Sequence, residues 1–125
     1  MDLHIDVPWI LQVAEAAEAD DPAPDDYGVP VSAVARHRAE LFEHPVYDGP
    51  YAKAAALVHT LGCCRWLERS NMAVAAASGV MYLEAAGISV KPDRKDAVAL
   101  KDLLLDPACT AGKIAALLRT WPTAT

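Results

Sequence analysis

Apolar residues recur along most of this chain at the three-and-four spacing of helices that bury one face. This spacing predicts helices over about residues 8–20, 30–41, 51–62, 71–86, 93–106 and 110–121. Leu3, Ile5 and Val7 alternate with polar residues and predict a very short N-terminal strand. The pattern therefore indicates an all-α fold of about five or six helices, in a single compact domain over residues 1–125.

Two of the expected helices are apolar on nearly every side, which is typical of central helices. They cover about residues 51–62 and 71–86, and the second carries small residues such as Ala75 and Gly79. Small residues let a neighbouring helix approach closely, so we expect these two helices to form the core. The segments 20–28 and 43–50 are rich in proline and glycine and predict exposed connections.

The charge of the chain narrows the classes of partner. Seventeen acidic residues against eleven basic ones give a formal net charge of -6. An acidic surface repels phosphate backbones, so we expect no nucleic-acid partner. No apolar run is long enough for a transmembrane helix, and the first residues lack the basic-then-apolar order of a signal peptide. We expect a soluble, cytoplasmic protein.

The cysteines predict little chemistry when only sequence spacing is considered. Cys63, Cys64 and Cys109 form no CxxC or Cys/His zinc pattern, so we expect reduced, partly buried thiols and no metal site. His59 and Cys63 stand at i and i+4, a spacing that suits a catalytic base and its thiol nucleophile. The apolar neighbours of His59 favour instead a core histidine that is hydrogen-bonded to a backbone group.

The polar connection between the two apolar helices contains the candidate binding residues. Ser70 is a plausible N-cap for the second helix, and backbone N–H groups at a helix N-terminus attract anions. Arg65 and Arg69 lie close to this end and are therefore anion-binding candidates; the alternative is that both arginines are solvated and pair with Glu68. We expect Trp66, in the same polar loop, to be at least partly exposed and to contact a partner.

The segment from Ala54 to Gly87 resembles the core of the Fic/Doc family and aligns with it without a gap. The matching features are Ala-Ala-Ala-Leu-Val-His at 54–59, a polar connection, Asn71 and an alanine-rich helix that ends in glycine. The resemblance implies a Doc-like helical bundle, with residues 43–50 in the place of a short substrate-docking hairpin, the flap. It also implies a protein partner, because the Doc toxin of bacterial toxin–antitoxin pairs is held by the helical tail of its antitoxin.

The catalytic motif of the family is nearly absent from this chain. Arg65 stands where the family has its histidine base, and Arg69 stands where it has the acidic metal ligand. Met72 and Ala73 replace the lysine and arginine that grip phosphates, and only Asn71 matches. The resemblance therefore implies that Asn71 is an anion-binding candidate. Arginine stays protonated at neutral pH and repels Mg²⁺, so the resemblance predicts no catalytic residue, no metal and no cofactor.

Three functions remain open from the sequence. The first is a catalytically degenerate Doc-like protein that binds a protein partner, either antitoxin-like or regulatory. The second is a phosphotransferase or nucleotidyltransferase that uses a nucleoside triphosphate, Mg²⁺ and non-standard residues. The third is a homo-oligomeric scaffold that is joined through small-residue helix faces.

Overall fold

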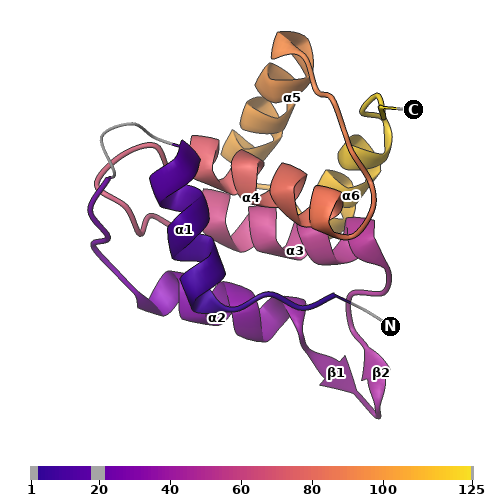
Figure 1. The fold of residues 1–125 in the computed structure, drawn as a ribbon, viewed down its shortest axis with the longest axis horizontal. Coiled ribbons are helices and arrows are strands. Elements are labelled where there is room, and N and C mark those ends of the chain that lie inside the picture. Colours follow the sequence, from indigo (N-terminus) through magenta and orange to yellow (C-terminus); the bar gives the residue numbers. More distant parts are fainter. Residues whose placement is uncertain (1–2, 18–21, 125) are drawn as a thin grey trace.

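The computed structural model describes residues 3–17 and 22–124, which form six helices and one small hairpin (Figure 1). This confirms the predicted all-α class, in a compact arrangement. In chain order, the elements are α1 (Val7–Ala17), α2 (Gly28–His37), β1 (Glu40–Leu41), β2 (His44–Pro45), α3 (Pro50–Cys63), α4 (Asn71–Ala85), α5 (Arg94–Leu105) and α6 (Ala111–Arg119).

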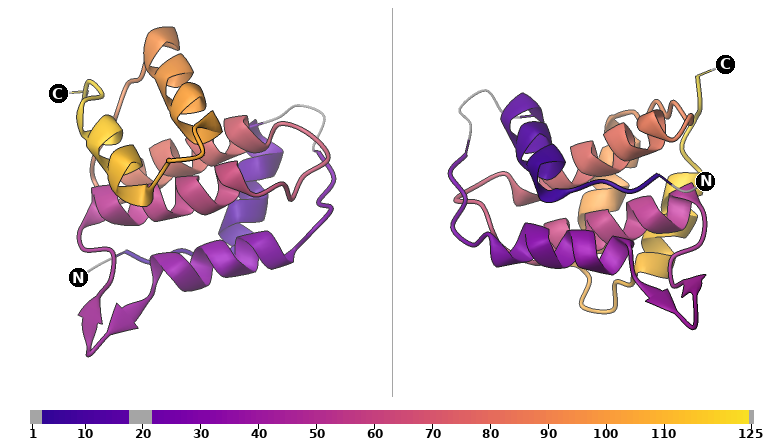
Figure 2. Two further views of the ribbon diagram at one scale, coloured as in Figure 1. Left: turned by 180° about the vertical axis from the view of Figure 1, so that it is seen from behind. Right: turned by 60° about the horizontal axis from the view of Figure 1, so that its bottom comes forward.

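Helices α3 and α4 lie side by side at the centre of the bundle, as the apolar pattern predicted (Figures 1 and 2). Every side chain of α3 from Lys53 to Val58 is buried. The close approach depends on Gly79 of α4, because a Cβ atom there would lie 2.6 Å from Cγ2 of Val58. A larger residue at this position would push the two central helices apart.

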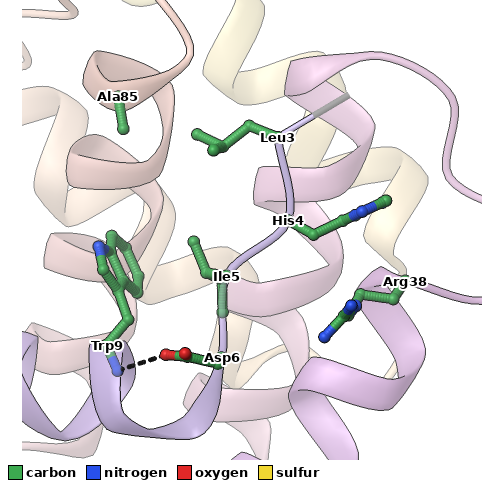
Figure 3. Close-up of a pocket in the computed structure, with 7 residues that line it drawn as sticks. All are labelled: Leu3, His4, Ile5, Asp6, Trp9, Arg38 and Ala85. Carbon is green, nitrogen blue, oxygen red and sulfur yellow. Dashed lines mark hydrogen bonds between the residues drawn. The ribbon is translucent and has the colours of Figure 1, made fainter. Parts of the chain in front are cut away.

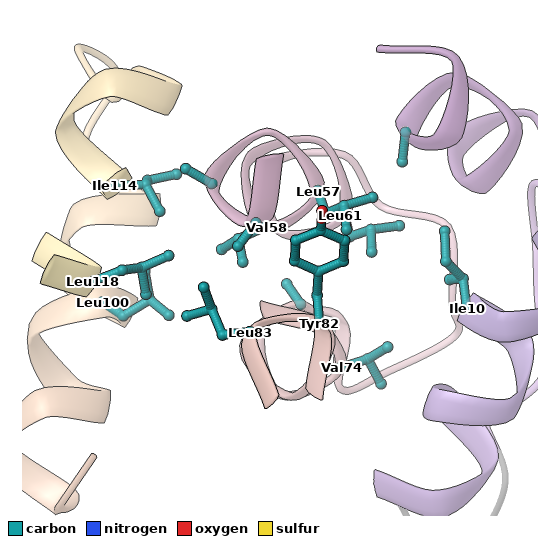
Figure 4. Packing of buried hydrophobic residues seen from close by; sticks show 14 of the residues in the cluster. Ile10, Leu57, Val58, Leu61, Val74, Tyr82, Leu83, Leu100, Ile114 and Leu118 are labelled. Carbon is teal, nitrogen blue, oxygen red and sulfur yellow. The ribbon is translucent and has the colours of Figure 1, made fainter. Parts of the chain in front are cut away.

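The other helices complete the core from two sides of this central pair (Figure 4). Ile10 of α1 enters from one side, and side chains of α5 and α6 enter from the other. The buried cluster includes Leu57, Val58, Leu61, Val74, Tyr82, Leu83, Leu100, Ile114 and Leu118. Burial of these side chains supplies the main driving force for folding.

The first described residues do not form the predicted strand. The backbone N–H of Ile5 donates to Nε2 of His37 at 3.2 Å, and the backbone oxygen of Leu3 accepts from the Tyr82 hydroxyl at 2.5 Å. The segment thus pairs with side chains of α2 and α4 and not with a neighbouring strand. Its alternation reflects the burial of Ile5, which is 6% exposed. Asp6 then caps α1 by accepting from the N–H of Trp9 at 3.0 Å.

The later helix starts follow their predicted caps. Asp93 and Asp96 form a reciprocal capping box at α5, and the Thr110 hydroxyl accepts from the N–H of Lys113 at α6. Helix α2 ends earlier than predicted, at His37, because residues 40–45 form the hairpin. None of the described helices has the length and apolar character needed to cross a bilayer.

Candidate functional site

The connection between α3 and α4 is fastened to the segment that precedes α2. The backbone oxygen of Trp66 accepts from the N–H groups of Asp25 at 2.6 Å and Asp26 at 3.2 Å. The N–H of Glu68 donates to the backbone oxygen of Ala23 at 3.0 Å. Because these bonds join residues far apart in the sequence, the loop is held as part of the body of the domain.

The prediction that Trp66 is exposed is wrong. The side chain is 0% exposed and belongs to the hydrophobic core cluster. The loop folds over the indole, because its backbone is paired on one side with residues 23–26 and on the other with Asn71. A tryptophan buried inside its own chain cannot be a partner anchor, so this role is withdrawn from Trp66.

Asn71 uses its side chain to close the same loop. Its Oδ1 accepts from the N–H groups of Trp66 and Leu67 at 3.0 Å each, and its Nδ2 donates to the backbone oxygen of Leu67 at 3.0 Å. Ser70 precedes it in a left-handed conformation with φ of 65° and makes no side-chain cap, contrary to our prediction. The hydrogen bonds of Asn71 indicate a structural role, and an anion would have to compete with them.

The two arginine candidates each face a carboxylate. Nη2 of Arg65 lies 3.2 Å from Oδ2 of Asp25, and Nη1 of Arg69 lies 2.5 Å from Oε1 of Glu68. The alternative interpretation, in which Glu68 pairs with an arginine, therefore holds for Arg69. Exposed pairs of this kind contribute about 0–1 kcal/mol each, so they add little stability. They do reduce the positive charge that the loop offers to an anion.

An apolar groove is lined in part by Met72 and Ala73. It has a volume of about 350 Å³ and lies between α4 and α5. Lys101 is its only charged lining residue among the described ones; the others are Met72, Ala73, Ala76, Ala97, Leu100 and Leu104. An apolar lining does not compensate the charge of a phosphate, so the groove does not suit a nucleotide's phosphate chain.

A polar network joins α2, α3 and the segment after the hairpin. Arg36 donates from Nε to the Tyr47 hydroxyl at 2.7 Å, and from Nη1 to Nδ1 of His59 at 2.7 Å and to Oγ1 of Thr60 at 3.1 Å. Burial and the charge of Arg36 lower the pKa of His59, while a hydrogen bond to the backbone of Cys109 raises it. His59 is thus half-buried, with the predicted backbone partner and an unpredicted guanidinium.

The thiols lie next to this network. Cys63 and Cys64 are exposed, contrary to the expectation of partial burial, whereas Cys109 is half-buried. The ligand atoms of His59, Cys63 and Cys109 all lie within 4.8 Å of one another. Partial desolvation and the neighbouring Cys109 raise the pKa of Cys63, so it is a protonated thiol at neutral pH. A catalytic nucleophile needs the thiolate, so this arrangement does not support a His59–Cys63 catalytic pair.

The N-terminal segment forms one wall of a second pocket, with a volume of about 400 Å³ (Figure 3). Its lining residues are Leu3, His4, Ile5, Asp6, Trp9, Arg38 and Ala85. The Asp6 carboxylate is turned toward the N–H of Trp9, which leaves His4 and Arg38 as the polar groups on the opposite side (Figure 3). Sequence reasoning missed this pocket because three separate parts of the chain build it.

The hairpin carries the most exposed of the large apolar side chains described. Phe42, in the turn between β1 and β2, is 86% exposed, and Leu41 and Val46 beside it are also exposed. The hairpin extends beyond the helical body at one end (Figures 1 and 2). The resemblance had placed the flap at residues 43–50, and the hairpin lies slightly earlier. Among the described residues, the most exposed aromatic side chain is therefore Phe42 and not Trp66.

These features describe a small helical domain with an exposed apolar hairpin and a closed interhelical loop. A scan of protein-family models finds no match to the chain. No curated protein and no solved structure matches it either.

Proposed function

We propose that this protein is a cytoplasmic, catalytically inactive Doc-like domain that acts by binding another protein through its β1–β2 hairpin. The observation that carries the proposal is Phe42, a large aromatic side chain that is 86% exposed at the hairpin tip. Aromatic side chains that enter a partner's pocket supply much of the binding energy of protein interfaces. The rest of the chain covers little of the Phe42 side chain.

The backbone of the hairpin turn supports a functional reason for this placement. Phe42 and Glu43 have φ angles of 51° and 65°, in the left-handed region. Two-residue hairpin turns with two such angles favour asparagine and glycine, which adopt them at little cost. A bulky residue there costs about 1–2 kcal/mol. Strain of this kind is most often retained where a side chain serves a function.

The charges around the tip indicate the chemistry of the partner. Glu40, Glu43 and Asp48 are exposed, and residues 40–48 contain no lysine or arginine. A matching partner would offer an apolar pocket for Phe42 with basic residues at its rim. We therefore propose a basic-rimmed protein surface as the binding partner, in an antitoxin-like or regulatory pair.

The order of the elements supports a Doc-like relationship. A hairpin, a buried helix, a polar loop and a second alanine-rich helix that begins at Asn71 follow one another along the chain. The resemblance predicts the same order, with the hairpin in the place of the flap that docks other proteins. The interactions of Arg65, Arg69 and Asn71 within the chain support the loss of catalysis.

Replacing Phe42 by asparagine should separate partner binding from stability. Asparagine tolerates the left-handed conformation, so Phe42→Asn should raise the free energy of unfolding by about 1 kcal/mol. Loss of the ring should weaken partner binding at least about tenfold, because hot-spot side chains contribute more than about 1.4 kcal/mol. Quantitative mass spectrometry of proteins captured from the native host, followed by binding titration of the purified partner, measures the effect.

The matched control is Val98→Asn, which changes an exposed apolar residue of α5, outside the hairpin. It should retain the same partner at the wild-type affinity. Equal binding by the Phe42 and Val98 variants would refute the hairpin as the docking surface. A captured second copy of this chain, with the same dependence on Phe42, would favour the homo-oligomeric scaffold.

The alternative function, a transferase that uses a nucleoside triphosphate, predicts the opposite behaviour in calorimetry. We expect no binding of ATP, GTP or UTP with a dissociation constant below the millimolar range, with or without Mg²⁺. The reason is that Asn71 and both arginines are engaged within the chain. Dihydrogen phosphate is a suitable anion control. Magnesium-dependent binding at micromolar concentration, lost in Asn71→Ala, would establish the alternative instead.

A further inference from the structure

Three possible metal-ligand atoms, two sulfurs and one imidazole nitrogen, meet at one end of the central helix pair, away from the hairpin. His59 and Cys63 lie one turn apart on α3, and Cys109 lies in the connection between α5 and α6. Their ligand atoms are all within 4.8 Å of one another. Two sulfurs bound to one tetrahedral zinc ion are about 3.8 Å apart, given Zn–S bonds of about 2.3 Å. The three side chains therefore need to move little to share one ion.

We propose that His59, Cys63 and Cys109 form a binding site for one thiophilic d10 metal ion, Zn²⁺ or Cu⁺. Zn²⁺ and Cu⁺ both bind well to cysteine sulfur and imidazole nitrogen, whereas Mg²⁺ and Ca²⁺ prefer carboxylate oxygens. Cys63 is exposed, so a fourth coordination position on Zn²⁺ would be open to water or to a ligand from outside the chain. The ion would link α3 to the α5–α6 connection.

The proton balance of binding follows from the state of the side chains. Both cysteines have a raised pKa, chiefly because of partial burial, so they begin as thiols. Zn²⁺ replaces the two S–H bonds by two Zn–S bonds and releases two protons to solvent. Burial lowers the pKa of His59 and keeps the imidazole neutral, which is the form that binds metal ions.

Arg36 is the group that must adjust when the ion binds. It donates to Nδ1 of His59, and the single ring proton then lies on Nε2. An ion at Nδ1 displaces Arg36 directly, and an ion at Nε2 moves the ring proton to Nδ1, which can then no longer accept. In both cases the guanidinium keeps Tyr47 and Thr60 as acceptors. The adjustment therefore leaves no unpaired buried cation.

The positions of the three ligands along the chain explain why local spacing in the sequence gave no sign of a metal site. Only His59 and Cys63 are near each other along the chain, and a two-ligand pair is too common to indicate a site. Cys109 comes from a distant connection that folding brings beside them. The adjacent Cys64 is exposed and is not part of the cluster, so it provides a matched control.

The experiment uses the full chain, reduced with a phosphine that does not bind metal, under anaerobic conditions. Co²⁺ serves as the spectroscopic probe for the Zn²⁺ arm, and a Cu⁺-specific chelator in competition serves for the Cu⁺ arm. We expect one ion per chain, with thiolate-to-cobalt charge-transfer bands that Zn²⁺ abolishes. Cys63→Ser and Cys109→Ser should each weaken binding more than about 100-fold, since even outer-shell losses weaken it about 10–100-fold. Cys64→Ser should bind as the wild type does.

Circular dichroism of the metal-free variants checks that each serine variant keeps its fold. Binding that Cys64→Ser weakens as much as Cys63→Ser would overturn the proposal. The absence of charge-transfer bands with Co²⁺, together with no uptake of Cu⁺ from the chelator, would also overturn it. The proposal would also be overturned by a chain that takes up neither ion when freshly reduced and later forms a Cys63–Cys109 disulfide. These outcomes are independent of partner binding at Phe42, so each proposal can fail alone.

Discussion

Replacing Trp66 by alanine should cost about 3–5 kcal/mol of folding stability, which is the usual range for a tryptophan removed from a well-packed core. The side chain is 0% exposed, and the loop backbone closes around it through bonds to Asp25, Asp26 and Asn71. Removing the ring leaves a cavity beneath a loop that cannot collapse without breaking those bonds. Urea unfolding, followed by circular dichroism, measures the loss.

The conservative variant Trp66→Phe provides the control. The indole Nε1 has no hydrogen-bond partner among the described residues, so phenylalanine forfeits volume but no hydrogen bond. We expect it to cost roughly 1–2 kcal/mol, in the range of core substitutions that shorten a side chain. A Trp66→Ala variant as stable as the wild type, but unable to bind its partner, would restore Trp66 as a contact residue and contradict its burial.

Acidification from pH 6.5 to pH 4 should destabilise the protein through His37. Burial, followed by the charges of His4, Lys53 and Arg38, lowers the pKa of His37 from 6.5 to about 4. In this window the unfolded chain binds a proton that the folded chain does not, so stability is complete above pH 6.5 and falls as pH decreases. The shift corresponds to about 3 kcal/mol at 1.36 kcal/mol for each pKa unit.

The geometry gives the same direction. Nε2 of His37 accepts from the backbone N–H of Ile5 at 3.2 Å, and a protonated Nε2 could no longer accept. His37→Gln, whose amide oxygen can replace the acceptor, should remove most of the slope of unfolding free energy between pH 6.5 and pH 4. His44→Gln, at an exposed histidine of the hairpin, should retain it. Equal slopes in the two variants would contradict the assignment to His37.

Most helix starts were predictable because their signals are local, although Ser70 makes no side-chain cap at α4. Asp6, Asp93 and Thr110 start helices in the structure as they do in the pattern, since a cap needs only its own side chain and the next turn of backbone. The small residues of the second central helix predicted the close approach of a neighbouring helix, and the contact of Gly79 with Val58 shows that this neighbour is α3. The prediction of a short N-terminal strand was wrong because the alternation of apolar and polar residues there reflects burial and not strand pairing.

The sequence by itself determined the all-α class and the two apolar central helices. Tertiary structure decided where the polar and aromatic side chains point. Folding buried Trp66, engaged Asn71 and the arginines within the chain, exposed Phe42 and brought Cys109 to His59 and Cys63. Helix formation depends on neighbouring residues in the chain, whereas exposure and side-chain pairing depend on segments that only the folded core brings together.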